Sequence, residues 1–570
     1  MTRIDSHMIT NDSFFTSLQE KTTKSNIKCY KVADFFCGGG GFSEGFKLAG
    51  FEIVFAVDKW QPAVTTHHAN HPNAKTYRDD VIRISNLSDE EFNQLIPDTE
   101  IIIGSPPCTS FSNSNKSGKA DKSLGIKLIE AYLRIIARKK TKKGSILKHW
   151  VLENVPNVVS FIKDEYTYKE LGIDYEGTLQ VKYPSSKVYN SKYFGVASNR
   201  KRYFCGDFPE PEQAIFNEGD ARTVNEILKS LGQPKQHLEK TIQDPNHRGF
   251  SMKSKDITDH HYIMEVAEYE WKKAKRMKQD KGYMGKMSFP ENLDKPSRTI
   301  MATMSCSSRE SMIYPYIPNE NRYRVPTVRE IGCIMSYPLD YRFYGKSKSL
   351  KYMLVGNSVP PLMSFAIAKS IAHANQLSIL KKYTPIHFEN KGVEEFVNLN
   401  FENFHVNTEK PKKANALFKY HIPYLIVNTF RVELTNYRSD FEKDDYRWDV
   451  EIHKSQGSKA KKFEPIIRLD FFQTRHQKTI AEFIESFKGK LDDANRFQQI
   501  YCKTEEERKK HMELGPYELL DSVKTFIDNT FTEKDIERVV TLEKEPKQLP
   551  YVIGAGSYVL NKLKEIYLNK

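Results

Sequence analysis

Four short apolar segments, each ending in a polar or glycine-rich turn, constrain the fold of this 570-residue chain more than any other feature. They are KVADFF before CGGGG, FEIVFAVD, EIIIG before SPPC, and HWVLENVP, and segments with helical patterns separate them. This alternation indicates βαβ units and a parallel sheet. Ligands bind such sheets beyond the carboxyl ends of the strands. We therefore predict an α/β fold with a doubly wound, mostly parallel, Rossmann-like sheet.

Charge and cysteine content narrow the class of protein. The formal net charge is +14, which favours a polyanionic partner, and nucleic acid is the leading candidate. The seven cysteines are widely spaced and form no CxxC pair, so the sequence indicates neither a disulfide framework nor a metal site. No apolar run approaches the ~18 residues of a membrane span, so we expect no membrane partner.

Shifts in composition along the chain predict its domain organisation. After a polar N-terminal extension comes the sheet domain, which a turn-rich region interrupts. The last part of the sheet domain then precedes a separate C-terminal α+β domain. The expected segments are residues 1–29, 30–207, 208–295, 296–379 and 380–570.

The glycine-rich turn DFFCGGGGFSEGF, at residues 34–46, is a candidate ligand site. A glycine turn between a strand and a helix lets a ligand approach the backbone, and the helix N-terminus faces that ligand. Asp58 ends the next strand, where an acid can hold ribose hydroxyls. The pattern indicates a ligand that contains a nucleoside, and a purely structural turn is the alternative.

Cys108 follows two prolines directly after the third apolar segment. Proline fixes φ and removes a backbone donor, so the turn is rigid and presents the next side chain outward. A thiol held in this way is a candidate nucleophile, although a small buried side chain is the other common role of cysteine. Glu153 ends the fourth segment, and the i, i+2 spacing of Arg200 and Arg202 predicts that both guanidinium groups share one strand face.

Two further segments leave alternatives open. A helix expected within residues 260–278 ends in a cationic stretch that is either a solvated helix end or a phosphate-contacting patch. The segment DVEIHK, with Asp449, Glu451 and Lys454, resembles a nuclease acid cluster, but its spacing from glutamate to lysine does not fit the common ExK form. We therefore leave the role of residues 380–570 open.

Nine segments, taken together and in order, resemble the cytosine-C5 DNA methyltransferases of the restriction–modification type. They span about residues 30–378 and read DFFCGGGGFSEGF, AVD, RDDV, GSPPCTSFS, VLENV, YFGVASNRKRYF, KPSRTI, PTVREIGCIMSYP and LVGNSVPP. The chain departs from the family at Thr109 and Ser198, where glutamine is frequent, and the helix after the cysteine loop matches weakly. None of these departures removes a catalytic group.

The resemblance implies a reaction. Cys108 would add to carbon 6 of a flipped-out cytosine, Glu153 would hold the ring at N3, and Arg202 with Arg200 would stabilise charge at O2. Carbon 5 would then take the methyl group of S-adenosyl-L-methionine. The resemblance also implies that residues 30–207 and 296–379 are catalytic and that residues 208–295 recognise the DNA target. An RNA (tRNA) cytosine methyltransferase and a non-catalytic DNA-binding relative are the alternatives.

The resemblance further implies binding residues and partners. The expected partner is double-stranded DNA, with a cognate restriction endonuclease acting on the same site, and the protein is expected to be a monomer in a prokaryotic cytoplasm. The polar loop of residues 110–119 would close behind the flipped base. Expected cofactor contacts are Phe36, Gly38, Gly40, Gly41, Asp58, Asp80, Pro107, Asn357 and Ser358. Expected DNA contacts are Lys116, Lys119, Lys272, Lys273 and Arg276.

Overall fold

The chain, seen in a computed structural model, divides into two compact units. The first comprises the described parts of Met1–Glu265, Glu291–Ser305 and Tyr314–His405. The second comprises those of Val266–Pro290, Cys306–Ile313 and Val406–Lys570. The described residues are 29–107, 111, 122–279, 286–317, 320–380, 382–388, 395–455, 461–542 and 544–568.

A seven-stranded sheet forms the centre of the first unit, with the strand order β3-β2-β1-β4-β5-β10-β8. The first five strands are parallel, and β10 is antiparallel to both of its neighbours. Chain order reverses between β1 and β4, which is where such sheets bind ligands. The strands are β1 (Lys31–Phe35), β2 (Glu52–Asp58), β3 (Lys75–Arg78), β4 (Ile101–Gly104), β5 (His149–Asn154), β8 (Lys187–Asn190) and β10 (Lys201–Cys205).

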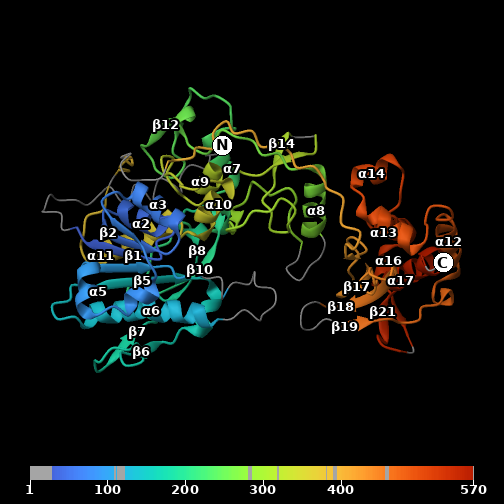
Figure 1. Ribbon diagram of the computed structural model, residues 1–570, viewed down its shortest axis with the longest axis horizontal. Helices are drawn as coiled ribbons and strands as arrows, with labels where there is room; N and C mark the ends of the chain where they lie inside the picture. Colours follow the sequence, from blue (N-terminus) through green and yellow to red (C-terminus); the bar gives the residue numbers. More distant parts are fainter. Residues whose placement is uncertain are drawn as a thin grey trace, which may run out of the picture. The chain divides into compact units, whose positions relative to one another are not determined.

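Helices cover both faces of this sheet (Figure 1). Successive residues of a strand point to opposite faces. In β1, Val32 therefore packs in a core with α2 and α11, whereas Phe35 packs in a core with α4, α5 and α6. The predicted doubly wound architecture is thus present. The helices are α2 (Gly41–Leu48), α3 (Gln61–Asn70), α4 (Val81–Ser85), α5 (Asp89–Leu95), α6 (Ser123–Thr141) and α11 (Pro361–Ala374).

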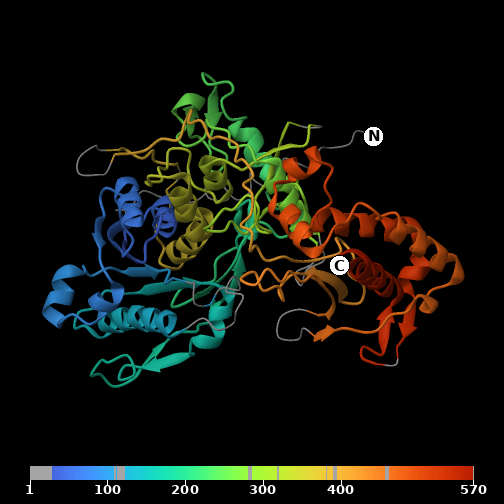
Figure 2. The same cartoon turned by 45° about the vertical axis from the view of Figure 1, so that its right-hand side comes forward.

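Smaller elements complete the first unit. The β6–β7 hairpin, teal in Figure 2, extends from the sheet beside α6. The other elements form the region between β10 and α11, except β9, which immediately precedes β10. They include α7 (Val224–Leu231), α9 (Val328–Ile334) and α10 (Lys348–Asn357). The short strands are β6 (Glu165–Thr167), β7 (Thr178–Gln180), β9 (Ser198–Asn199), β11 (Thr241–Gln243), β12 (Ser251–Lys253), β13 (Ser297–Arg298), β14 (Tyr314–Ile317) and β15 (Arg322–Arg324).

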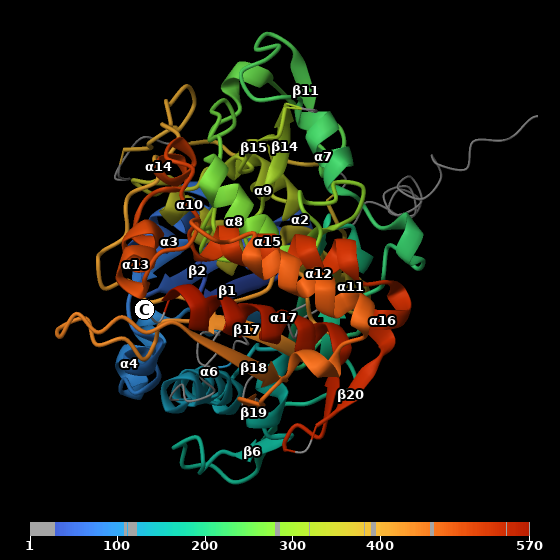
Figure 3. The ribbon, with the colours of Figure 1, turned by 90° about the vertical axis from the view of Figure 1, so that its right-hand side faces the viewer.

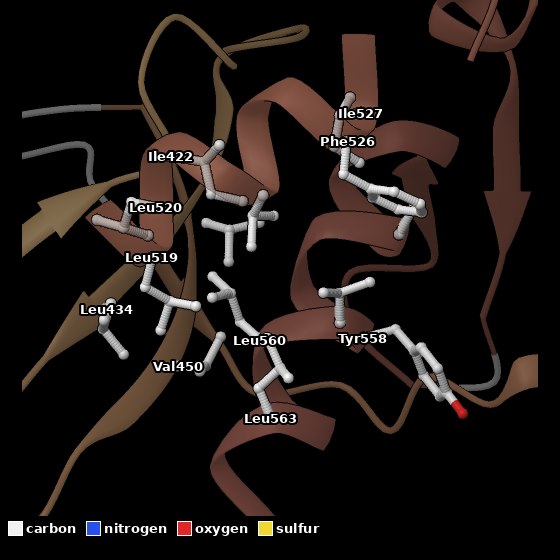
Figure 4. Close-up of a cluster of buried hydrophobic side chains, with 14 of the residues drawn as sticks. Ile422, Leu434, Val450, Leu519, Leu520, Phe526, Ile527, Tyr558, Leu560 and Leu563 are labelled. Atoms are coloured by element: carbon white, nitrogen blue, oxygen red, sulfur yellow. The ribbon is translucent and has the colours of Figure 1, made fainter. Parts of the chain in front are cut away.

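The second unit combines a four-stranded antiparallel sheet, β16-β17-β18-β19, with helices. Helix α17 lies along β17 and β18 (Figure 3). Because most of its residues are apolar, it is buried in the core that Figure 4 shows. The strands are β16 (Lys419–His421), β17 (Phe430–Thr435), β18 (Asp449–Lys454), β19 (Lys461–Phe463), β20 (Val539–Thr541) and β21 (Gln548–Pro550). The helices are α8 (Glu268–Gln279), α12 (Thr474–Glu485), α13 (Ala494–Cys502), α14 (Glu505–Lys510), α15 (Pro516–Thr530), α16 (Glu533–Glu537) and α17 (Tyr551–Leu563).

The helix expected within residues 260–278 differs from α8 in two ways. It begins only at Glu268, because the preceding residues are extended and form single bridges, Ile263 with Asn403 and Glu265 with Arg324. In addition, α8 belongs to the second unit, although we placed residues 208–295 together in one region. No helix among the described residues is long and apolar enough to cross a membrane.

Candidate active site

The glycine turn connects β1 to α2 at the carboxyl edge of the sheet. The turn has positive φ angles at three positions, with 57° at Phe36, 52° at Gly38 and 81° at Gly40. At the latter two positions glycine adopts this conformation without strain. The amide of Gly38 donates a hydrogen bond of 3.0 Å to Oδ2 of Asp58, at the end of β2. The structure thus brings the predicted ribose-binding acid to the predicted glycine turn.

The glycines of this turn have different surroundings. A Cβ on Gly40 would lie 2.3 Å from the Tyr341 hydroxyl, and one on Gly41 would lie 2.2 Å from the Val359 carbonyl oxygen. A Cβ on Gly38 would meet only the Phe36 carbonyl, at 3.9 Å. Neighbouring atoms therefore leave no room for a larger side chain at Gly40 or Gly41. At Gly38 there is room for a ligand.

Two other predicted cofactor positions lie close to this turn. Ser358 caps the end of α10, and its Oγ would lie 3.1 Å from a Cβ on Gly39. Asn357, the last residue of α10, has an exposed side chain. Asp80 caps α4 through a 2.9 Å hydrogen bond from the Ile82 amide, and it forms an ion pair with Lys59 at 2.8 Å.

Glu153 and Arg202 form the central ion pair of the candidate site. Glu153 lies near the end of β5 and is 4% exposed, and its Oε1 is 3.1 Å from Nε of Arg202 on β10. Arg200 is also buried, but its Nη1 donates to the Ile300 carbonyl at 3.3 Å. The two arginines therefore have different partners, because β10 begins only at Lys201 and Arg200 precedes it.

The proline turn before Cys108 is tied to both neighbouring strands. The amide of Ser105 donates to the Phe35 carbonyl at 3.1 Å, and Nδ2 of Asn154 donates to the Pro106 carbonyl at 3.0 Å. Asn154, to which we gave no role from the sequence, thus connects β5 to the turn. Pro107 is exposed. The predicted positions Cys108, Lys116 and Lys119 lie outside the described residues.

Two of the three expected phosphate contacts on α8 form ion pairs within the second unit. Lys272 forms ion pairs with Glu268 at 2.6 Å and with Glu505 at 2.7 Å. Arg276 forms an ion pair with Asp521 and lies over the rings of Tyr420 and Tyr517. Lys273 is exposed. Carboxylates of the second unit thus pair with Lys272 and Arg276, and the contact of these two residues with DNA stays a prediction.

Buried polar side chains of the elements that flank the glycine turn form a hydrogen-bonded cluster. Ser43 of α2 donates a 2.6 Å hydrogen bond to Asp34 of β1, and Nε2 of His67 lies 3.0 Å from the same hydroxyl. Burial raises the pKa of Asp34 to about 8 and lowers that of His67 to about 3. Both side chains are therefore neutral at pH 7 in the folded protein.

The raised pKa of Asp34 gives a measurable pH dependence. Between the unfolded pKa near 4 and the folded pKa of about 8, the folded state binds one more proton, so stability falls as pH rises. We expect the free energy of unfolding of the wild type to fall, relative to Asp34→Asn, by up to ~1.4 kcal/mol per pH unit in this window. Urea denaturation from pH 5 to 9 measures this difference, and a constant difference would contradict the assignment.

The fold and the position of the glycine turn define the fold class of this protein. A mostly parallel sheet with helices on both faces and a glycine turn at its carboxyl edge is an α/β Rossmann-like fold. The family model of the C-5 cytosine-specific DNA methylases matches residues 30–373, more than half of the chain. The chain belongs to this family, as its sequence motifs predict. Residues 374–570 lie outside the match.

Curated proteins and solved structures are similar to this chain over about 60% of its length. The type II methyltransferase M.MthTI of Methanothermobacter thermautotrophicus is 27% identical over 362 residues, which cover 60% of this chain and 96% of that protein. M1.HphI of Haemophilus parahaemolyticus, also a type II methyltransferase, is 28% identical over 62% of this chain and 90% of its own. The structure of the S. pombe Dnmt2 methyltransferase covers 61% of this chain and 99% of its own, with 17% identity and a TM-score of 0.38.

Proposed function

We propose that this protein transfers a methyl group from S-adenosyl-L-methionine to carbon 5 of a flipped-out cytosine in a specific duplex DNA sequence. The observation that carries the proposal is the buried pair of Glu153 and Arg202 beside the proline turn that precedes Cys108. A carboxylate, a guanidinium group and a thiol are the three groups that activation of a cytosine ring requires, and Cys108 follows the proline turn in the sequence.

Each of these side chains has a separate chemical role. Carbon 5 of cytosine is a weak nucleophile until the Cys108 thiolate adds to carbon 6, which makes carbon 5 enamine-like. Glu153 holds the ring at N3 and the exocyclic amine, which favours this addition and excludes thymine. Arg202 stabilises charge that develops at O2. Loss of the carbon 5 proton and then of the cysteine completes the reaction.

The residues around the glycine turn fit S-adenosyl-L-methionine, which supplies the methyl group when bound. Gly38 faces open space, and Asp58 has a carboxylate beside it for ribose hydroxyls. Ser358 lies against Gly39, so the last motif of the family reaches the same turn. We assign Phe36, Asp80, Pro107 and Asn357 to the rim of this site.

The substrate and the biological setting follow from the family. The target base must leave the duplex, at a cost of ~2–4 kcal/mol, because its ring atoms are inaccessible in stacked DNA. We assign target recognition to the part of residues 208–295 that lies in the first unit. The similarity to type II methyltransferases supports a role in restriction–modification or phage defence, together with an endonuclease for the same site.

A methyl-transfer assay tests the proposed reaction. Tritiated S-adenosyl-L-methionine is incubated with the full chain and either unmethylated duplex DNA or tRNA. We expect label in DNA at the carbon 5 position of cytosine and none in tRNA. Label in tRNA alone would replace DNA by RNA as the substrate, and label in neither would contradict the enzymatic proposal.

A further inference from the structure

Three metal-binding side chains converge on one face of the sheet in the second unit. Glu433 of β17 lies directly opposite Glu451 of β18 in the antiparallel register. His453 follows Glu451 by two residues and therefore shares its face. The three residues are only 5%, 7% and 8% exposed. None of them belongs to the residues that the methylase family model matches.

The ligand atoms are spaced as they are around a single ion. Nε2 of His453 is 2.8 Å from Oε2 of Glu451 and 3.2 Å from Oε2 of Glu433. All three ligand atoms lie within 4.8 Å of one another. Ligands bound to one cation at ~2.0–2.2 Å are about 3 Å apart, so a single ion can contact all three after a small shift.

The two oxygens of each carboxylate have different surroundings. Oε1 of Glu433 accepts a 2.6 Å hydrogen bond from Arg431, and Oε1 of Glu451 is 2.7 Å from Nζ of Lys462. These cations hold the outer oxygens, so both Oε2 atoms point toward His453.

Glu433 Oε2 is buried and accepts no hydrogen bond in the described part of the chain. Its nearest cations, the Lys419 ammonium and the His453 ring, both lie at 3.2 Å. Carboxylates directly opposite each other on antiparallel strands repel, and burial increases the cost. A divalent cation bound to both Oε2 atoms would add two positive charges against this repulsion and would give the Glu433 Oε2 atom a ligand bond.

The surroundings indicate what such a cation would do. Three protein ligands leave coordination positions open for water and a substrate oxygen. The Lys419 side chain is 34% exposed and its Nζ lies 3.2 Å and 3.5 Å from the two Oε2 atoms, so it can reach an anion bound at the metal. Lys454, Lys461 and Lys462 are exposed at the adjoining strand ends. This combination suits a phosphodiester.

We propose that Glu433, Glu451 and His453 bind one divalent cation and that this centre hydrolyses phosphodiester bonds of DNA. A metal-bound water adds its oxygen to phosphorus and the P–O3′ bond breaks. The products are a 5′-phosphate and a 3′-hydroxyl, which takes up the proton, and no redox partner is needed. The site differs from the sequence-based cluster of Asp449, Glu451 and Lys454, because cross-strand pairing supplies Glu433 and the imidazole replaces lysine.

Calorimetric titration of the chelator-treated full chain with Mn²⁺ tests the metal site. We expect one Mn²⁺ per chain in the wild type and a loss of affinity of at least about 100-fold in Glu451→Gln. Glu464→Gln is the matched control, because Glu464 also pairs with Lys462 but is half exposed and lies outside the cluster. Equal Mn²⁺ binding by wild type and Glu451→Gln, or no binding, would overturn the site. Circular dichroism verifies that each variant is folded. His453→Gln is a second ligand variant for the same Mn²⁺ titration.

Cleavage of long unmethylated DNA, with Mn²⁺ or Mg²⁺ and without S-adenosyl-L-methionine, tests the activity. We expect cleavage by the wild type, no cleavage by Glu451→Gln, and about 100-fold slower cleavage by Lys419→Met with Mn²⁺ still bound. Bound Mn²⁺ without DNA cleavage would overturn the hydrolytic role. Methyl transfer should be unchanged in Glu451→Gln, and cleavage unchanged in Cys108→Ala, so failure of one proposal is distinguishable from failure of the other.

Discussion

Replacement of Cys108 by alanine is expected to lower the rate of methyl transfer to DNA by at least about 10³-fold, because the covalent route through carbon 6 is lost. Binding of S-adenosyl-L-methionine should remain, since the glycine turn and Asp58 do not depend on this side chain. Tritium transfer measures the rate, and equilibrium dialysis with the labelled cofactor measures binding.

Cys205→Ala is the matched control for this experiment. Cys205 lies on β10, opposite Leu152 of β5, but burial raises the pKa of its thiol to about 12. The thiol of Cys37, in the glycine turn, also has a pKa raised well above its usual value by burial. Neither thiol can supply a thiolate at neutral pH. Methyl transfer that persists in Cys108→Ala would contradict the assigned nucleophile, as would its loss in Cys205→Ala with the fold intact.

Lys351→Met should cost the first unit about 3–5 kcal/mol of stability, because it leaves a buried charge without its partner. Lys351 of α10 and Asp259 are both 0% exposed, and Nζ lies 2.7 Å and 2.8 Å from the two carboxylate oxygens. The same ammonium donates to the Val397 carbonyl, and Asp259 accepts from the Leu399 amide. Urea denaturation of the full chain measures the loss.

Two further variants show whether the buried charge is the cause. Adding Asp259→Asn to Lys351→Met removes the uncompensated carboxylate and should recover a large part of the lost stability. Lys346→Met, at an exposed position before α10, should change stability by less than about 0.5 kcal/mol. Additive losses in the double variant would show that the two residues act independently.

Local patterns in the sequence predict the central sheet and the glycine turn of the first unit well. The apolar segments become β1, β2, β4 and β5, and the acid that ends β2 contacts the glycine turn because parallel strands end at the same edge. Family membership follows from the same motifs. These features depend on neighbouring residues or on the sheet geometry, so they can be inferred without the structure.

Pairings between distant segments could not be predicted in this way. The i, i+2 spacing of Arg200 and Arg202 does not reveal that one bonds to the Ile300 carbonyl, 100 residues away, and the other to Glu153. The amphipathic pattern of α8 predicts a buried face but not the partner that covers it. The opposition of Glu433 and Glu451 depends on strand register, which spacing alone does not give.

The second unit is assembled from segments that lie far apart in the sequence, and this affects when its ion pairs can form during synthesis. Helix α8 is translated long before its partners, since Arg276 precedes Asp521 by 245 residues. At ~5–20 residues per second, α8 waits roughly 12–50 s for that carboxylate. During this interval Lys272 lacks Glu505 and Arg276 lacks Asp521, so the nascent chain presents a more basic helix than the finished protein does.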